Sequence, residues 1–130
     1  MERIGLMDEA NLGPVMGPYS QGLKYNGLIF TAHCGITAEK GVVSESVYEQ
    51  TKQAFLNAER ILQQGGSSLE RILKTTVYLT DAEDFAEMNR AYGEMLTALP
   101  RPARATVYVK SLSPGVKVEI DFVAAAQNCD

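Results

Sequence analysis

The chain has 130 residues, of which 45% are hydrophobic, and its 12 basic and 16 acidic side chains give a formal charge of −4. A chain of this length forms one compact domain and buries roughly two-thirds of the surface that its unfolded form exposes. The acidic balance, without a run of basic residues, argues against the positive stripe that binds nucleic acid. We therefore expect a single domain over residues 1–130 with no nucleic-acid partner.

The compartment is the next inference from composition. Cys34 and Cys129 lie far apart, so they predict neither a disulfide framework nor a metal-ligand pair. The N-terminal stretch "MERIGLMDEA" contains acidic residues and lacks the apolar core of a signal peptide. Nothing in the chain approaches the roughly 18 consecutive apolar residues of a membrane span. These features indicate a cytoplasmic protein without a membrane partner.

The first elements expected are two strands on either side of Asn26-Gly27, because Asn-Gly supplies the positive φ angles of a tight hairpin turn. A helix of four to five turns follows. Ser46 and Glu49 have the spacing of a capping box, and Gly65-Gly66 end the apolar pattern. The apolar face of this helix consists of Val47, Ala54, Ala58, Ile61 and Leu62.

The second half of the chain predicts a strand in "RILKTTVYLT", then a helix, then two more strands. Thr80 and Glu83 again have capping-box spacing. The strands "ARATVYVK" and "VKVEIDFVA" are joined by "SLSPG", whose residues favour a turn. The order ββ-α-β-α-ββ predicts an α+β fold, a single sheet with two helices on one face. The helical stripe consists of Phe85, Met88, Tyr92 and Met95.

The last two strands raise the question of function. Side chains alternate along a strand, so we expect Arg104 and Thr106 to share the face away from the helices with Glu119 and Asp121. If "SLSPG" closes a simple hairpin, Thr106 lies opposite Glu119 and Arg104 lies near Asp121. These residues are either ordinary solvated charges or a site in which Arg104 holds a carboxylate and Glu119 serves a water molecule. Alternation alone does not decide between the two.

Four motifs occur in order: "GPYSQG" at residues 17–22, "LKTTVYLTDAEDFAEMNRAY" at 73–92, "PARATV" at 102–107 and "VKVEID" at 116–121. Together they resemble the Rid family of reactive intermediate deaminases, also called YjgF, over nearly the whole chain. The resemblance implies a chorismate-mutase-like fold and a homotrimer with three clefts between subunits. It also implies hydrolysis of 2-iminobutanoate and 2-iminopropanoate to 2-oxo acids and ammonia, without a cofactor or metal.

The resemblance also implies roles for individual residues. Arg104 matches the arginine that binds the substrate carboxylate, and Glu119 matches the glutamate that positions the attacking water. Tyr19 and Asn89 match a tyrosine and an asparagine of the cleft, and Thr106 stands where members have cysteine or threonine. Without the resemblance, Tyr19 reads as a half-buried aromatic residue and Asn89 as a residue that bridges backbone groups.

One segment departs from the family. Members commonly have "SGQ" where this chain reads "TAHC" at residues 31–34. A gapless match puts Ala32 at the family serine, and a shift by one residue puts Thr31 there and retains a hydroxyl. The shift reverses the strand face, and we favour Thr31 because Gly35 then meets a family glycine. We interpret His33 as structural and Cys34 as inert.

Two other classes of function remain open. One is a non-catalytic trimeric protein that binds a small carboxylate metabolite with the same arginine, and the departure at residues 31–34 keeps it in consideration. The other is a translation-inhibiting ribonuclease, which the acidic composition disfavours. Chaperone-like roles would depend on surfaces that the sequence does not define.

Overall fold

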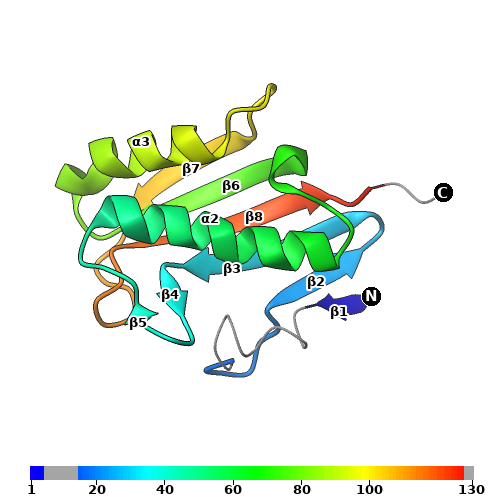
Figure 1. Cartoon of the computed structure of the whole chain (residues 1–130), viewed down its shortest axis with the longest axis horizontal. Coiled ribbons are helices and arrows are strands. Elements are labelled where there is room, and N and C mark those ends of the chain that lie inside the picture. Colours follow the sequence, from blue (N-terminus) through cyan, green and yellow to red (C-terminus); the bar gives the residue numbers. More distant parts are fainter. Residues whose placement is uncertain (5–14, 128–130) are drawn as a thin grey trace.

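The computed structural model describes residues 1–4 and 15–127. Its main feature is a six-stranded sheet in the order β1-β2-β3-β8-β6-β7. Helices α2 and α3 lie side by side on one face of this sheet (Figure 1), as the α+β prediction requires. The strands are β1 (Glu2–Ile4), β2 (Gly22–Tyr25), β3 (Leu28–Cys34), β6 (Ile72–Leu79), β7 (Ala103–Tyr108) and β8 (Val118–Ala125). A separate two-stranded sheet consists of β4 (Ile36–Thr37) and β5 (Gly41–Val42).

The predicted hairpin between β2 and β3 is confirmed. Its two turn residues, Asn26 and Gly27, have φ angles of 50° and 76°, and Tyr25 is paired with Leu28. Helix α2 (Val47–Gln64) has the expected length and begins at Ser46, whose Oγ accepts a hydrogen bond from the Glu49 amide at 3.2 Å. Local signals of turn and cap residues were therefore sufficient to predict this hairpin and this helix, but not β1 or the β4–β5 sheet.

The start of the second helix differs by one residue from the prediction. Asp81, rather than Thr80, caps the 3-10 turn that precedes the helix: Asp81 has an extended backbone, and its Oδ1 accepts from the Glu83 amide at 2.9 Å. The 3-10 turn η3 (Ala82–Asp84) leads into α3 (Phe85–Met95). Thr80 directly follows β6, and its amide donates to the Lys117 carbonyl. Another 3-10 turn, η2 (Leu69–Arg71), joins α2 to β6.

The predicted hairpin between the last two strands is wrong. β7 pairs with β6 in parallel, whereas β8 lies between β3 and β6 and is antiparallel to both. Residues 109–117 therefore cross an intervening strand. The buried Gln50 of α2 holds the end of this crossing, because its amide donates to the Gly115 carbonyl at 3.0 Å and accepts from the Lys117 amide at 2.8 Å.

This pairing reverses the expected faces of β7. Arg104 is in register with Thr75, and Thr106 with Val77, and both partners are fully buried under the helices. Cα partners in a sheet point to the same side, so Arg104 and Thr106 lie on the helix-covered face. The faces of β8 are as expected, since Val118, Ile120 and Phe122 are buried and Glu119 faces away.

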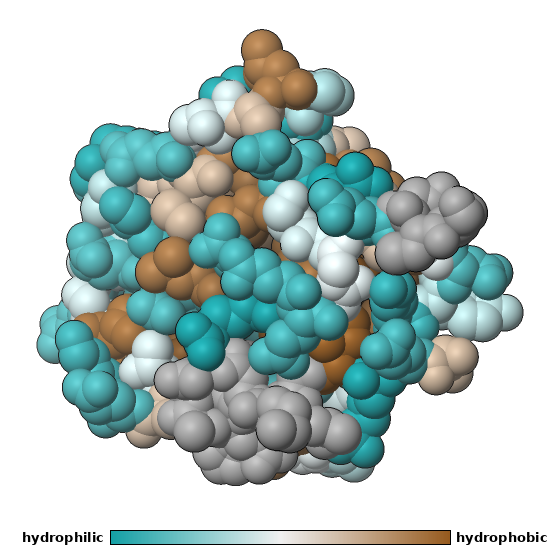
Figure 2. Space-filling model, turned by 45° about the vertical axis from the view of Figure 1, so that its right-hand side comes forward, coloured by the Kyte–Doolittle hydropathy of each residue, from teal (hydrophilic) through white to brown (hydrophobic). Residues whose placement is uncertain are grey.

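The core lies between the sheet and the two helices. Phe55 of α2 is at its centre, with its ring edge-to-face to Tyr92 at 5.3 Å and to Phe122 at 5.4 Å between centroids. Within residues 1–4 and 15–127 no helix covers the other face, where Phe30 and Val107 are 44% and 39% exposed. The surface in Figure 2 is mainly hydrophilic, with smaller hydrophobic patches.

Candidate functional site

Arg104 and Asn89 are brought together, as a shared site requires. The Arg104 Nη1 donates to the Asn89 Oδ1 at 2.7 Å, which links the edge strand β7 to helix α3. The guanidinium carbon lies 4.7 Å from the ring centre of Tyr92 and 5.7 Å from that of Phe85. Tyr92 is itself fixed by a 2.8 Å hydrogen bond to Thr75. Arg104 is thus held over an aromatic floor by a neutral partner.

A hollow of about 310 Å³ opens beside this guanidinium. It contains a second arginine, Arg101, that the sequence reading did not single out, although it stands in the same "RPAR" stretch. The Arg101 Nε donates to the Leu96 carbonyl at 2.8 Å. Burial raises the pKa of the Tyr92 hydroxyl, and the charges of Arg104 and Arg101 act in the opposite direction. The hollow is lined by Asn89, Tyr92, Gly93, Arg101, Pro102 and Arg104.

Glu119 lies on the open face and has a different environment. It is half-buried, and Asp121 lies two residues further along the same strand. The Asp121 Oδ1 accepts a hydrogen bond from the Thr76 amide, and its Oδ2 accepts one from the Tyr78 hydroxyl, both at 3.0 Å. Burial raises the pKa of the Glu119 carboxyl above its usual value, and the charge of Asp121 raises it further. The hydrogen bond to Asp121 raises the pKa of Tyr78. Glu119 is therefore more readily protonated than a solvated glutamate.

The predicted convergence of Arg104, Thr106 and Glu119 does not occur within one chain. Glu119 is in register with Tyr78 and Cys34 on the open face, whereas Arg104 and Thr106 lie on the helix-covered face. β6 also separates the strands that carry them. The expected proximity of Arg104 and Asp121 is wrong for the same reason. The predicted residues form two separate groups.

The prediction that Thr31 presents a hydroxyl to a cleft is also corrected. Thr31 is 8% exposed under the helices, where its Oγ1 donates to the Gln21 carbonyl and lies 2.7 Å from the His33 Nε2. Ala32 is exposed on the open face, in register with Asp121 and next to the strand position of Glu119. On the face of Glu119, the position of the family serine is therefore occupied by the methyl group of Ala32, as the gapless match predicts.

The protonation states of the neighbouring residues His33 and Cys34 are consistent with structural roles. Burial lowers the pKa of His33 to about 4, so its imidazole is neutral at physiological pH. Burial, and then the charge of Glu119, raises the pKa of Cys34 to about 12, so its thiol stays protonated. Neither group is in a state suited to nucleophilic or acid–base catalysis at neutral pH.

Tyr19 does not line the Arg104 hollow. Its side chain is 60% exposed, its amide donates to the Gly17 carbonyl at 2.8 Å, and its hydroxyl accepts from the Met16 amide at 3.3 Å. The structure thus leaves this aromatic ring on the surface of the single chain, available to a ligand or to another chain.

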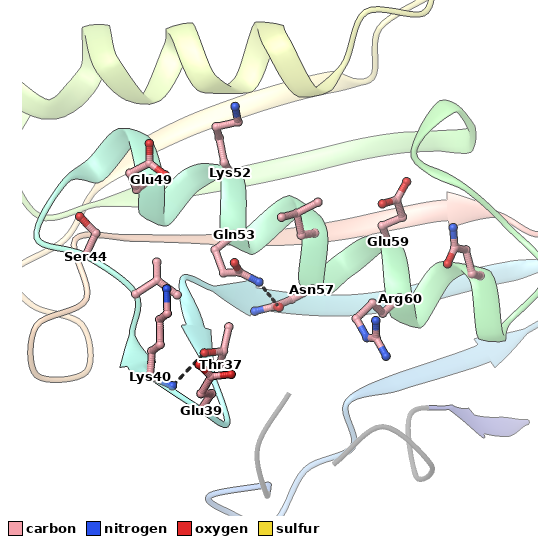
Figure 3. Close-up of a pocket in the computed structure, with 13 residues that line it drawn as sticks. Thr37, Glu39, Lys40, Ser44, Glu49, Lys52, Gln53, Asn57, Glu59 and Arg60 are labelled. Atoms are coloured by element: carbon pink, nitrogen blue, oxygen red, sulfur yellow. Dashed lines mark hydrogen bonds between the residues drawn. The ribbon is translucent and has the colours of Figure 1, made fainter. Parts of the chain in front are cut away.

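A larger groove of about 680 Å³ follows the solvent side of α2 and the β4–β5 loop (Figure 3). It contains none of the predicted site residues. Polar contacts within the groove include a 2.9 Å hydrogen bond from Gln53 to Asn57 and a 3.1 Å bond from the Lys40 amide to Thr37. Its charged residues are Glu39, Glu49, Glu59, Lys40, Lys52 and Arg60, three of each sign.

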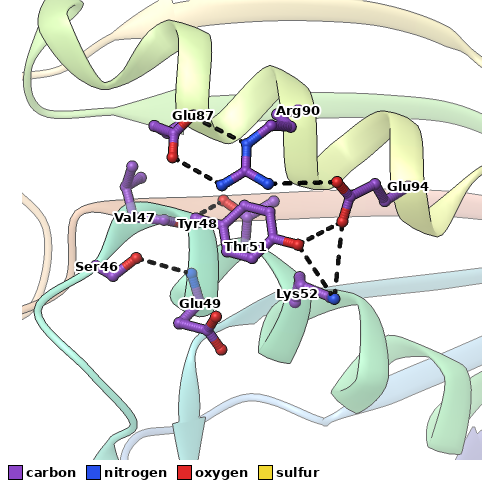
Figure 4. A network of polar contacts seen from close by, with 9 residues as sticks. All are labelled: Ser46, Val47, Tyr48, Glu49, Thr51, Lys52, Glu87, Arg90 and Glu94. Carbon is purple, nitrogen blue, oxygen red and sulfur yellow. Dashed lines mark hydrogen bonds and ion pairs between the residues drawn. The ribbon is translucent and has the colours of Figure 1, made fainter.

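A polar network joins the outer sides of α2 and α3 (Figure 4). The Arg90 guanidinium stacks 3.8 Å above the Tyr48 ring and forms ion pairs with Glu87 and Glu94. The Tyr48 hydroxyl donates to Glu94, and Lys52 donates to that hydroxyl at 3.3 Å. Its helix-spanning contacts tie α3, which carries Asn89, to α2.

Within residues 1–4 and 15–127, no cluster of three His, Cys, Asp or Glu side chains has an arrangement that could bind a metal ion. None of the helices in this part of the chain is long and apolar enough to cross a membrane.

Comparison with known proteins identifies relatives over most of the chain. The family model described as Endoribonuclease L-PSP matches residues 11–126. A relative from Arabidopsis thaliana, "Reactive Intermediate Deaminase A, chloroplastic", is 40% identical over 84% of this chain and 59% of its own length. A RutC family protein from Aquifex aeolicus is also 40% identical, over 84% of this chain and 89% of its own length.

Solved structures agree with this assignment. A Rid family protein of Yersinia pestis, YyfA, has a TM-score of 0.85 at 30% identity and covers 94% of this chain and 98% of its own. TdcF of E. coli, solved with bound serine, has a TM-score of 0.85 at 29% identity, over 98% of this chain and the whole of its own. The extent of these matches, together with the fold and the four motifs, shows that this chain belongs to the Rid family, also called YjgF.

Proposed function

We propose that this protein hydrolyses reactive 2-imino and enamine acids, such as 2-iminobutanoate and 2-iminopropanoate, to 2-oxo acids and ammonia without a cofactor. The observation that carries the proposal is the Arg104 guanidinium, which is bound by Asn89 at 2.7 Å and forms no ion pair with a carboxylate in the described part of the chain. Its other N–H groups match the two oxygens of a substrate carboxylate. The name of the Arabidopsis relative supports this reaction class.

Glu119 is the proposed proton-transfer group. Its carboxylate accepts a proton from the water that adds to the imine carbon, and the resulting carbinolamine releases ammonia when its nitrogen receives a proton. A carboxyl whose pKa is raised by burial and by Asp121 holds a proton more readily than a solvated carboxyl, which favours accepting a proton and returning it. Water is consumed, and the products are the 2-oxo acid and ammonia.

The separation of Arg104 and Glu119 favours a site between subunits. The two side chains lie on opposite faces of one sheet, so one chain cannot place both against the same small substrate. We propose a homotrimer in which the open face of one chain meets the Arg104 edge of the next, with Asn89, Thr106 and Tyr19 contributing to the three clefts. The exposed Phe30 and Val107 would then be covered.

A second candidate function is a trimeric receptor that binds a small carboxylate metabolite without turnover. The observation in its favour is Ala32, because the open face has a methyl group at the position where the family resemblance implies a serine hydroxyl. The serine bound to TdcF is a small amino acid with one carboxylate. Cytoplasmic location stays a prediction, since relatives include proteins named mitochondrial and chloroplastic.

The test generates the imine in place. A threonine dehydratase supplies 2-aminocrotonate, formation of 2-oxobutanoate is followed, and semicarbazide competes for the remaining imine. Wild-type protein is compared with Arg104→Ala, Arg104→Lys and Lys40→Ala, the last of which removes a charge from the remote α2 groove. We expect Arg104→Ala to lower kcat/KM about 10- to 100-fold, which corresponds to a lost charge-assisted pair.

Arg104→Lys retains the charge but loses the planar fork, so we expect it to restore only part of the activity. Lys40→Ala should match the wild type. Acceleration that is unaffected by Arg104→Ala would contradict the site. No acceleration by any protein, together with 2-oxobutanoate binding that requires Arg104, would instead establish the receptor.

A further inference from the structure

The hollow beside Arg104 has a charge composition that one substrate carboxylate does not match. Two of its six described lining residues, Arg101 and Arg104, are cations, and none is acidic. The larger groove along α2, by contrast, balances its three cations with three glutamates. An unbalanced pair of cationic side chains in a small hollow suits a ligand with two negative charges.

Both guanidiniums are positioned by neutral acceptors. The Arg104 Nη1 is bound by the Asn89 amide oxygen at 2.7 Å, and the Arg101 Nε by the Leu96 carbonyl at 2.8 Å. Neither arginine forms an ion pair with a carboxylate in residues 1–4 or 15–127. Each head group is therefore oriented while its remaining N–H groups stay free for an anion.

The dimensions and the floor of the hollow suit a short dicarboxylic acid. A volume of about 310 Å³ is at the small end of ligand sites, so it excludes large anions such as dinucleotides. Tyr92 and Pro102 contribute apolar surface to the lining of the hollow. Arg101 and Arg104 are three residues apart, a spacing of at most about 10 Å between their Cα atoms in extended chain.

We propose that Arg101 is a specificity-determining residue that binds a second, side-chain carboxylate, so that the preferred substrates are 2-imino acids derived from dicarboxylic amino acids. Arg104 binds the carboxylate next to the imine carbon, and Arg101 binds the distal one. The inference rests on the proposed deaminase function for its chemistry, which is the same addition of water and release of ammonia. It rests on the two arginines for the choice of substrate.

The experiment compares two imines made in the same way. L-Glutamate oxidase forms 2-iminoglutarate and an L-amino-acid oxidase forms 2-iminobutanoate from 2-aminobutyrate, with catalase present to remove peroxide and semicarbazide as the competing trap. The proteins are wild type, Arg101→Gln, Arg101→Lys and Lys40→Gln. Lys40→Gln matches the charge change of Arg101→Gln at an exposed position outside the hollow.

We expect wild-type kcat/KM to be at least about tenfold higher for 2-iminoglutarate than for 2-iminobutanoate. Arg101→Gln should remove this preference by lowering only the dicarboxylic reaction, mainly through KM. Arg101→Lys should retain part of it, and Lys40→Gln all of it. Turnover of 2-iminobutanoate with no dicarboxylic preference, or an equal loss for both imines in Arg101→Gln, would overturn the inference while the deaminase function stood.

Calorimetry with 2-oxoglutarate and 2-oxobutanoate separates the remaining outcomes. If neither imine is hydrolysed, the proposed function fails, and binding alone decides the inference. Tighter binding of 2-oxoglutarate that is lost in Arg101→Gln would support the second subsite. Equal binding of the two oxo acids, or no binding of either, would overturn it.

Discussion

The two faces of the six-stranded sheet arise from the same alternation of side chains, yet they differ in what covers them. On the face under α2 and α3, Ile120 and Phe122 are at most 1% exposed. On the other face Phe30 is 44% exposed, and Glu119 stands half-buried beside Asp121. One face is buried under the two helices, whereas the other has an exposed apolar surface that another chain could cover.

This difference explains how the functional groups are divided. The covered face ends at the edge strand β7, where Arg104 reaches past the sheet to Asn89 of α3 and is held in one orientation. The open face places Glu119 in a partly desolvated acidic setting. The core thus gives Arg104 rigid support, and the open face raises the proton affinity of Glu119.

The largest expected effect tests the contrast between the faces directly. Phe122→Ala removes a ring packed at 5.4 Å from Phe55 in the core, and we expect the free energy of unfolding to fall by about 3–5 kcal/mol. Phe30→Ala is the matched change on the open face, where a half-exposed ring contributes about 1 kcal/mol or less in the single chain. Urea unfolding measures both.

Protein concentration distinguishes how the two variants act. The loss in Phe122→Ala should be the same at every concentration, because it is intrinsic to the fold. The loss in Phe30→Ala should grow under conditions where the chain associates, since it acts through the covered open face. Equal losses that do not depend on concentration would remove the distinction between the two faces.

A second test uses the buried imidazole of the covered face. The unfolded chain protonates His33 near pH 6.5, but the folded chain does so only near pH 4, because burial lowers its pKa. The contribution of neutral His33 to the free energy of unfolding is therefore fully present above pH 6.5. It is lost as the pH falls toward 4, by about 3 kcal/mol in total. His33→Gln should flatten the pH dependence of urea unfolding in this window. An unchanged slope would show that His33 is not the responsible group.

The smallest expected effect concerns the carboxyl pair of the open face. Burial and Asp121 raise the pKa of Glu119, so stability falls as the pH rises through that pKa, and Glu119→Gln should be slightly more stable at neutral pH. Asp121→Asn removes the charge but not the burial. We expect carboxyl NMR titration to show a lower pKa for Glu119 in Asp121→Asn. A value equal to that of the wild type would exclude coupling between the two.

Much of the fold follows from short-range signals. The Asn26-Gly27 turn and the Ser46 cap were predictable because turn and cap chemistry involves residues at most three positions apart. Asp81 displaced Thr80 as the cap of η3 because both residues have side chains that can cap, and only the path of the chain after β6 decides which one precedes the turn.

The candidate site was predictable in part. Arg104 and Asn89 do meet, and His33 and Cys34 have the protonation states of structural groups. Arg101 was missed because an arginine between two prolines has no periodic signal, and only the packing of this segment against α3 forms the hollow that both arginines line.

The sequence by itself determined the α+β class, the two helices, the hairpin of β2 and β3, and the faces of β8, since these depend on local residue patterns and on one strongly apolar alternation. Only the tertiary structure decided that β7 pairs in parallel with β6 rather than with β8. The alternating pattern of β7 does not determine which of its side chains face the helices, so this was decided by the strand with which β7 pairs. That choice placed Arg104 and Glu119 on opposite sides of the sheet.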